Sequence, residues 1–129
     1  NGISRINNLN EIVSCEKRYG NVTLADLQKL NIIEKIQFFR NKANCIVICT
    51  GSSLTNCVIF KNLISKAIIL VEPWSIKDNA ALFGGWAYYI DLYSKSYFVL
   101  GHEAVKIQNS NMSSTIFNIN QLSNILKNN

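Results

Sequence analysis

The chain has 129 residues, 48% of them hydrophobic, so one domain with one buried core is expected rather than two. Its formal charge of +5 permits a phosphorylated partner, but the cations are scattered over expected helix faces, which argues against a nucleic-acid-binding protein. No apolar span is long enough to predict a transmembrane segment.

The first third of the chain alternates short β-branched runs with apolar residues at helical spacing. In order, these patterns predict the end of a strand at residues 3–6, a helix at 9–19, a strand at 22–24 and a helix at 32–43. Gly20 is expected to stop the first helix. Asn31 is expected to cap the second helix, because Glu34 stands three residues later, as a capping box requires.

A strand, a turn and a helix in the middle of the chain organise the rest. β-Branched residues predict a buried, central parallel strand at residues 45–50, and residues 54–63 predict a helix. The turn between them follows the carboxyl end of the strand, where open α/β sheets bind ligands through free backbone N–H groups, and Gly51 permits close approach. An anion is the expected ligand. The side chains that add hydrogen-bond donors are those of Thr50, Ser52, Ser53, Thr55 and Asn56.

The second half of the chain continues the alternation of strands and helices. In order, the patterns predict an apolar strand at residues 66–72, a helix at 78–90, a strand at 96–100, an irregular stretch at 102–114 and a helix at 118–127. Pro73 is expected to end the first of these strands. The predicted fold class is therefore α/β: one Rossmann-like three-layer domain over residues 1–129, with a mostly parallel sheet of about five strands.

The four cysteines do not form a zinc-binding pattern, because no two of them are spaced as Cys-x-x-Cys and His102 is far away in the sequence. Cys45 and Cys49 lie an even number of residues apart on one expected strand, so their side chains share a face. All four thiols, including those of Cys15 and Cys57, are expected to be reduced and free. Reduced thiols favour a cytoplasmic location.

Several segments together resemble the C-terminal, donor-binding half of family 61 glycosyltransferases. Residues 5–12 and 17–20 are similar to the family's first helix and the Lys-Tyr-Gly that ends it, and residues 34–43 resemble the helix before the signature turn. The run Thr50-Gly51-Ser52-Ser53-Leu54-Thr55-Asn56 stands where the family usually has His-Gly-Ala-Gly-Leu-Thr-Asn. Downstream, a strand that ends in Glu72 is followed by an aromatic helix and an aromatic strand, in the family's order.

The resemblance implies one half of an inverting, metal-independent GT-B glycosyltransferase without a cofactor. A nucleotide-sugar donor would be the substrate, and an N-terminal acceptor domain or a partner chain would supply the catalytic base. Arg5 would hold the diphosphate bidentately, and Glu72 would bind a ribose hydroxyl. The implied donor-binding residues are Arg5, Thr50, Gly51, Ser52, Ser53, Thr55, Asn56 and Glu72.

The departures from the family pattern leave a second interpretation open. Thr50 replaces the signature histidine, and a threonine can donate a hydrogen bond to a phosphate but cannot act as a base near neutral pH. The alternative is therefore a degenerate donor-binding module or a scaffold that acts with a partner chain. Arg5 could equally be a solvated surface residue, Glu72 could form a loop salt bridge, and His102 could be a catalytic base or an exposed loop residue.

Overall fold

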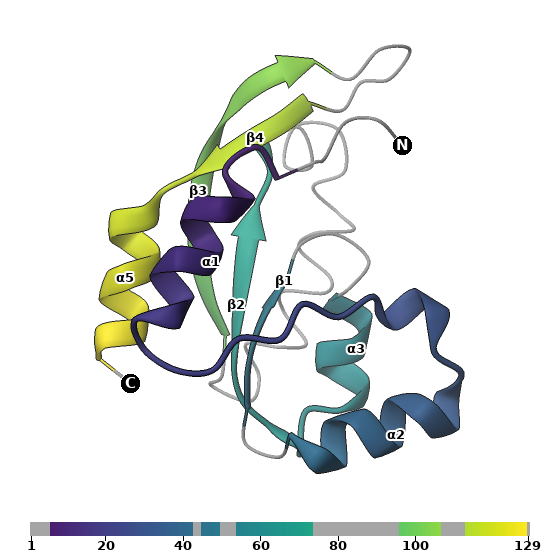
Figure 1. Cartoon of the computed structure of the whole chain (residues 1–129). Coiled ribbons are helices and arrows are strands. Elements are labelled where there is room, and N and C mark those ends of the chain that lie inside the picture. The colour runs from purple at the N-terminus through teal and green to yellow at the C-terminus, as the bar shows by residue number, and fades with distance from the viewer. Residues whose placement is uncertain (1–5, 43–44, 50–53, 74–95, 107–112, 129) are drawn as a thin grey trace. The chain divides into compact units, whose positions relative to one another are not determined.

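The computed structural model describes residues 6–42, 45–49, 54–73, 96–106 and 113–128 (Figure 1). The chain divides into two compact units. The first comprises Asn1–Thr23, Leu70–Ala80 and Phe98–Asn129, and the second comprises Leu24–Ile69 and Ala81–Tyr97. The predicted helix at 78–90 and most of the predicted strand at 3–6 lie outside the described residues.

The fold is α/β, as predicted, with a four-stranded mixed sheet in the order β1-β2-β3-β4. Strands β1 (Cys45–Cys49) and β2 (Ile64–Val71) are parallel. Strands β3 (Ser96–Lys106) and β4 (Ser113–Phe117) are antiparallel. A mostly parallel Rossmann-like sheet of about five strands is thus not confirmed by the part of the chain that the structure describes.

In the first unit, helices α1 (Leu9–Lys17) and α5 (Ile119–Lys127) lie side by side (Figure 1). Both helices were predicted, and Asn118 caps α5 by accepting a hydrogen bond from the Gln121 backbone N–H at 3.0 Å. Their apolar faces belong to the core of this unit. The buried apolar side chains there are those of Ile12, Cys15, Leu70, Val71, Val99, Phe117, Leu122 and Leu126.

The segment before α1 is joined to β4 by hydrogen bonds that continue the pattern of a sheet. The Asn7 backbone N–H donates to the Thr115 carbonyl at 2.9 Å, and Ile6 forms an isolated parallel bridge with Thr115. The buried Asn8 side chain completes the connection. Its Nδ2 donates to the Phe117 carbonyl and its Oδ1 accepts from the Phe117 N–H, each at 2.9 Å, so one amide satisfies both backbone groups of a buried residue.

The prediction of an irregular stretch at residues 102–114 is wrong at both of its ends, because β3 continues to Lys106 and β4 begins at Ser113; residues 107–112 lie outside the described residues. The reason is that β4 buries hydroxyl groups in place of apolar side chains. Ser114 Oγ accepts from the Val105 N–H at 3.1 Å and is 3.5 Å from Asn7 Nδ2, so it is paired within the unit. Gly101 lies opposite Phe117, and a Cβ there would approach the Ile116 carbonyl oxygen and the Phe117 ring to 2.9 Å.

In the second unit, α2 (Ile32–Asn41) begins with the predicted capping box. Asn31 Oδ1 accepts from the Glu34 N–H at 2.9 Å, and Glu34 Oε1 accepts from the Asn31 N–H at 3.0 Å.

The prediction of a strand at residues 22–24 is wrong. Leu24 is 69% exposed and the segment before the short 3₁₀ helix η1 (Leu27–Lys29) pairs with no strand, so a β-branched run had no sheet to join within the described residues.

Strand β2, and not β1, is the buried strand of the parallel pair. Ala67, Ile68 and Ile69 are almost fully buried, whereas β1 stands at the end of the described strand order and is half-buried over four of its five residues. The prediction that the Cys45 strand is central is therefore corrected, although its parallel pairing is confirmed. Strand β2 ends at Val71, two residues before Pro73, as predicted.

Aromatic stacking packs α2 against the end of α3 (Leu54–Ile59). The buried rings of Phe39 and Phe60 are stacked, with centroids 4.5 Å apart and planes at 18°. Phe38 contacts Phe39 edge-on at 5.4 Å and is only half-buried. The apolar core of this unit contains Phe39, Cys49, Cys57, Phe60, Ile64, Ala67, Ile68 and Ile69.

Replacing Asn8 by alanine should destabilise the protein by about 2–4 kcal/mol, because two buried backbone groups of Phe117 lose their partner. Equilibrium unfolding in urea, followed by circular dichroism, measures this loss. The matched control is Asn10→Ala on the exposed side of α1, which should stabilise by less than about 0.7 kcal/mol through helix propensity. A loss below about 1 kcal/mol for Asn8→Ala would contradict the role assigned to its amide.

Replacing Phe39 by alanine should cost about 3–5 kcal/mol, since a fully buried ring is removed and Phe60 loses its stacking partner. Phe38→Ala is the control on the neighbouring, half-buried ring, and we expect less than half of that loss. The same urea titration compares the two variants. Equal losses would show that the stacked pair does not dominate the packing of α2.

Candidate functional site

The strand, turn and helix predicted as the binding site lie in the second unit. Strand β1 runs parallel to β2, and its last residue, Cys49, pairs with Ile69. Helix α3 begins at Leu54, so only residues 50–53 connect it to β1. The structure thus confirms the strand and the helix on each side of the predicted turn, although α3 ends at Ile59 and not at residue 63 as predicted. Thr50, Gly51, Ser52 and Ser53 lie outside the described residues.

The remaining predicted site residues do not all lie in the second unit. Thr55 and Asn56 are in the first turn of α3, where Asn56 is half-buried and its carbonyl accepts from the Phe60 N–H at 2.9 Å. Glu72 follows β2 directly and belongs to the first unit. Its side chain is 1% exposed, which leaves its carboxylate little contact with a dissolved ligand. Arg5 lies outside the described residues.

His102 is in β3 and not in the loop where the sequence analysis placed it. It is exposed and faces Ile116 in the antiparallel ladder. In the part of the chain that the structure describes, no group of three or more His, Cys, Asp or Glu side chains is arranged to hold a metal ion.

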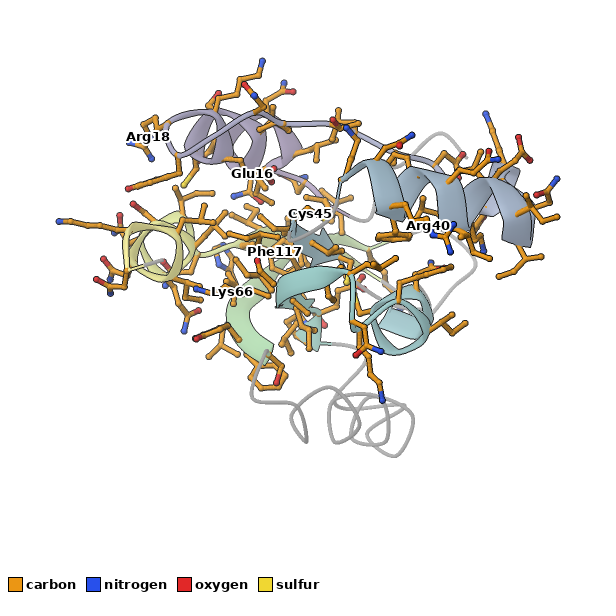
Figure 2. All side chains as sticks on the ribbon, turned by 90° about the horizontal axis from the view of Figure 1, so that it is seen from below. Glu16, Arg18, Arg40, Cys45, Lys66 and Phe117 are labelled. Atoms are coloured by element: carbon orange, nitrogen blue, oxygen red, sulfur yellow. The ribbon has the colours of Figure 1, made fainter. Side chains whose placement is uncertain are left out.

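Lys66 begins the strand that was predicted to be apolar, and it was not among the predicted site residues. Its side chain is 9% exposed and its Nζ lies 4.5 Å from the centre of the Tyr97 ring, which stabilises the buried charge by a cation–π contact. Lys66 pairs with Ile46 near the amino end of β1, where Cys45 also lies (Figure 2). The turn follows the opposite end of β1, so this cation is not one of its ligand-binding groups.

Two cysteine thiols lie on either side of the turn. Cys49 ends β1, Cys57 is in α3, and their Sγ atoms are 3.6 Å apart in a buried environment. The hydrogen bond between the two sulfurs raises the pKa of Cys49, with burial adding to the effect, and lowers the pKa of Cys57. This contact could not be predicted from sequence, because it depends on how α3 packs against β1.

The other thiols are distinct from this pair. Burial raises the pKa of Cys45, and Cys57 is close enough to add a smaller electrostatic effect in the same direction. Cys15 is buried in the first unit. All four cysteines are free thiols, which confirms the prediction made from their spacing.

Comparison of the chain with protein-family models, with curated proteins and with solved structures finds no match. The similarity to family 61 glycosyltransferases therefore stays a prediction that depends on the sequence motifs. Among the helices of the described segments, none has the length and apolar character needed to cross a bilayer.

Proposed function

We propose that this chain is the donor-binding part of a glycosyltransferase, and that the turn between β1 and α3 holds the diphosphate of a nucleotide sugar. The observation that carries the proposal is the strand–turn–helix itself: a strand parallel to its neighbour leads through four residues, Thr-Gly-Ser-Ser, into a helix. This is the arrangement in which α/β sheets present backbone N–H groups to phosphates.

The chemistry of the turn suits an anion that carries several acceptor oxygens. Gly51 permits close approach of the backbone, and the hydroxyls of Thr50, Ser52 and Ser53 are donors. Helix α3 has only six residues, so hydrogen bonds contribute more to the proposed site than the helix dipole does. In a transferase, such donors would stabilise the charge that develops on the leaving diphosphate.

The rest of the enzyme would come from outside this chain. In the proposed GT-B arrangement, an N-terminal acceptor domain or a partner chain supplies the base that activates the acceptor hydroxyl. The nucleotide sugar is a substrate, and no cofactor or metal is part of the proposal. Contributions of Arg5 and Glu72 to the same site stay predictions. A cytoplasmic location belongs to the proposal as well, because the four thiols are reduced.

Thr50 favours a second candidate function, a module that binds the nucleotide sugar without turnover. The histidine that the family usually has at this position could carry a proton near neutral pH, whereas a threonine cannot. The coding sequence upstream of Asn1 distinguishes between a transferase and a module that binds without turnover. An α/β region of roughly two hundred or more residues there would favour the transferase, because a second domain of that size could complete the cleft.

The test of donor binding is an NMR titration with uridine and guanosine diphosphates and their sugars. We expect amide shifts that cluster on residues 50–57 and a weak affinity of about −4 to −6 kcal/mol, because half of the cleft is missing. Gly51→Val should abolish the shifts while the protein stays folded, since a β-branched side chain blocks the close approach of a phosphate.

Gly20→Val is the matched control for this variant. No atom lies within 4 Å of the position that its Cβ would occupy, so the substitution should leave both the fold and the titration unchanged. If no amide shift appears at millimolar ligand, the donor-site proposal is contradicted and a scaffold function is favoured.

A further inference from the structure

Cys49 and Cys57 bring two buried thiols into contact in the second unit. Their sulfur atoms are 3.6 Å apart, and a disulfide bond of about 2.05 Å would require an approach of only about 1.5 Å. Side-chain rotation of two thiols on neighbouring elements can supply a movement of that size. The contact is therefore close to the geometry of a disulfide, although both residues are free thiols in the structure.

The surroundings of the two sulfurs favour a division of roles. The shared hydrogen bond lowers the pKa of Cys57 and raises the pKa of Cys49, so Cys57 is the thiol that ionises first and Cys49 retains its proton. The thiolate is the nucleophilic form of cysteine. Cys57 is only 1% exposed and Cys49 9%, which excludes bulky reagents but leaves local opening as a route for an oxidant nearly as small as water.

We propose that Cys49 and Cys57 form a reversible dithiol–disulfide pair that is oxidised by hydrogen peroxide. The Cys57 thiolate attacks one peroxide oxygen, the O–O bond breaks, and hydroxide leaves, so that Cys57 becomes a sulfenic acid. The Cys49 sulfur then attacks the Cys57 sulfur, the S–O bond breaks, and the Cys49 proton leaves with the hydroxyl group as water. Both thiols are oxidised together by two electrons, and peroxide is reduced to water and hydroxide.

The disulfide would connect the end of β1 directly to α3. It would close a loop over residues 50–56, which includes the whole predicted phosphate-binding turn, and so restrict the backbone freedom of that turn. Formation of the bond does not require that the turn bind a nucleotide sugar. The inference therefore stands or fails separately from the proposed function.

The experiment treats the native, reduced protein with hydrogen peroxide, removes the excess with catalase, and alkylates the protein in guanidinium chloride. Mass spectrometry should count four alkylated cysteines before treatment and two after it, with the protein lighter by two hydrogen atoms before alkylation. Peptide mapping should find Cys49 linked to Cys57. Reduction with dithiothreitol should restore four alkylated cysteines.

Two control variants separate this pair from the other thiols. Cys45 is the competing partner, because Cys57 is close enough to it to contribute to its raised pKa, and Cys15 is in the other unit. The linkage should survive in Cys45→Ala and Cys15→Ala and be absent from Cys57→Ala. The peptide map of the unchanged chain identifies the linked cysteines even if a variant fails to fold.

Three results would overturn the inference. These are four alkylated cysteines after peroxide treatment, a linkage that joins Cys57 to Cys45, or sulfinic acid at Cys57 without any disulfide. A mixture of linkages should appear only when the oxidation is carried out in guanidinium chloride, where the native contact between the two sulfurs is lost.

Discussion

The amide of Asn8 is the interaction on which the first unit depends. It forms two hydrogen bonds, each 2.9 Å long, with the backbone of Phe117, which is 109 positions away along the chain. Its carbonyl accepts from the Ile12 N–H at the start of α1, but its side chain does not cap that helix. The side chain is used instead to attach the segment before α1 to the end of β4, directly before α5, and α1 lies beside α5. A long-range polar contact and the packing of two apolar helix faces therefore join the same two parts of the chain.

The second unit depends mainly on apolar packing. Strand β2 is almost fully buried, and the stacked rings of Phe39 and Phe60 hold α2 near the end of α3. The polar residues of β2 are the exposed Ser65 and the buried Lys66, and the charge of Lys66 is satisfied in part by the Tyr97 ring. Packing of α3 against β1 has two chemical consequences. It fixes Cys49 and Leu54, the residues on each side of the Thr-Gly-Ser-Ser segment, and it brings the thiols of Cys49 and Cys57 to 3.6 Å.

The proposed donor site and the proposed thiol pair therefore occupy one stretch of chain. In the two proposals, backbone N–H groups and hydroxyls of the turn would bind a diphosphate, and the sulfurs of the residues on either side of it in the sequence would be oxidised by a small peroxide. If both proposals hold, the redox state of Cys49 and Cys57 would alter the freedom of the turn that binds the donor. The two properties can be separated, because one is read from amide shifts and the other from a disulfide linkage.

The sequence by itself determined the elements whose signals are local. Helices α1, α2 and α5 follow from their apolar residues, with a predicted cap at Asn31 of α2. Strands β1 and β2 follow from apolar, β-branched runs, and Pro73 marks where β2 ends. Only the tertiary structure decided which runs pair. Val22 and Thr23 are β-branched but pair with no described strand, whereas Ser114 of β4 is buried and receives hydrogen bonds from Val105 and Asn7, which lie elsewhere in the chain. The place of β1 at the end of the described strand order and the Cys49–Cys57 contact likewise depend on packing between separate elements, which the spacing of residues along the chain does not specify.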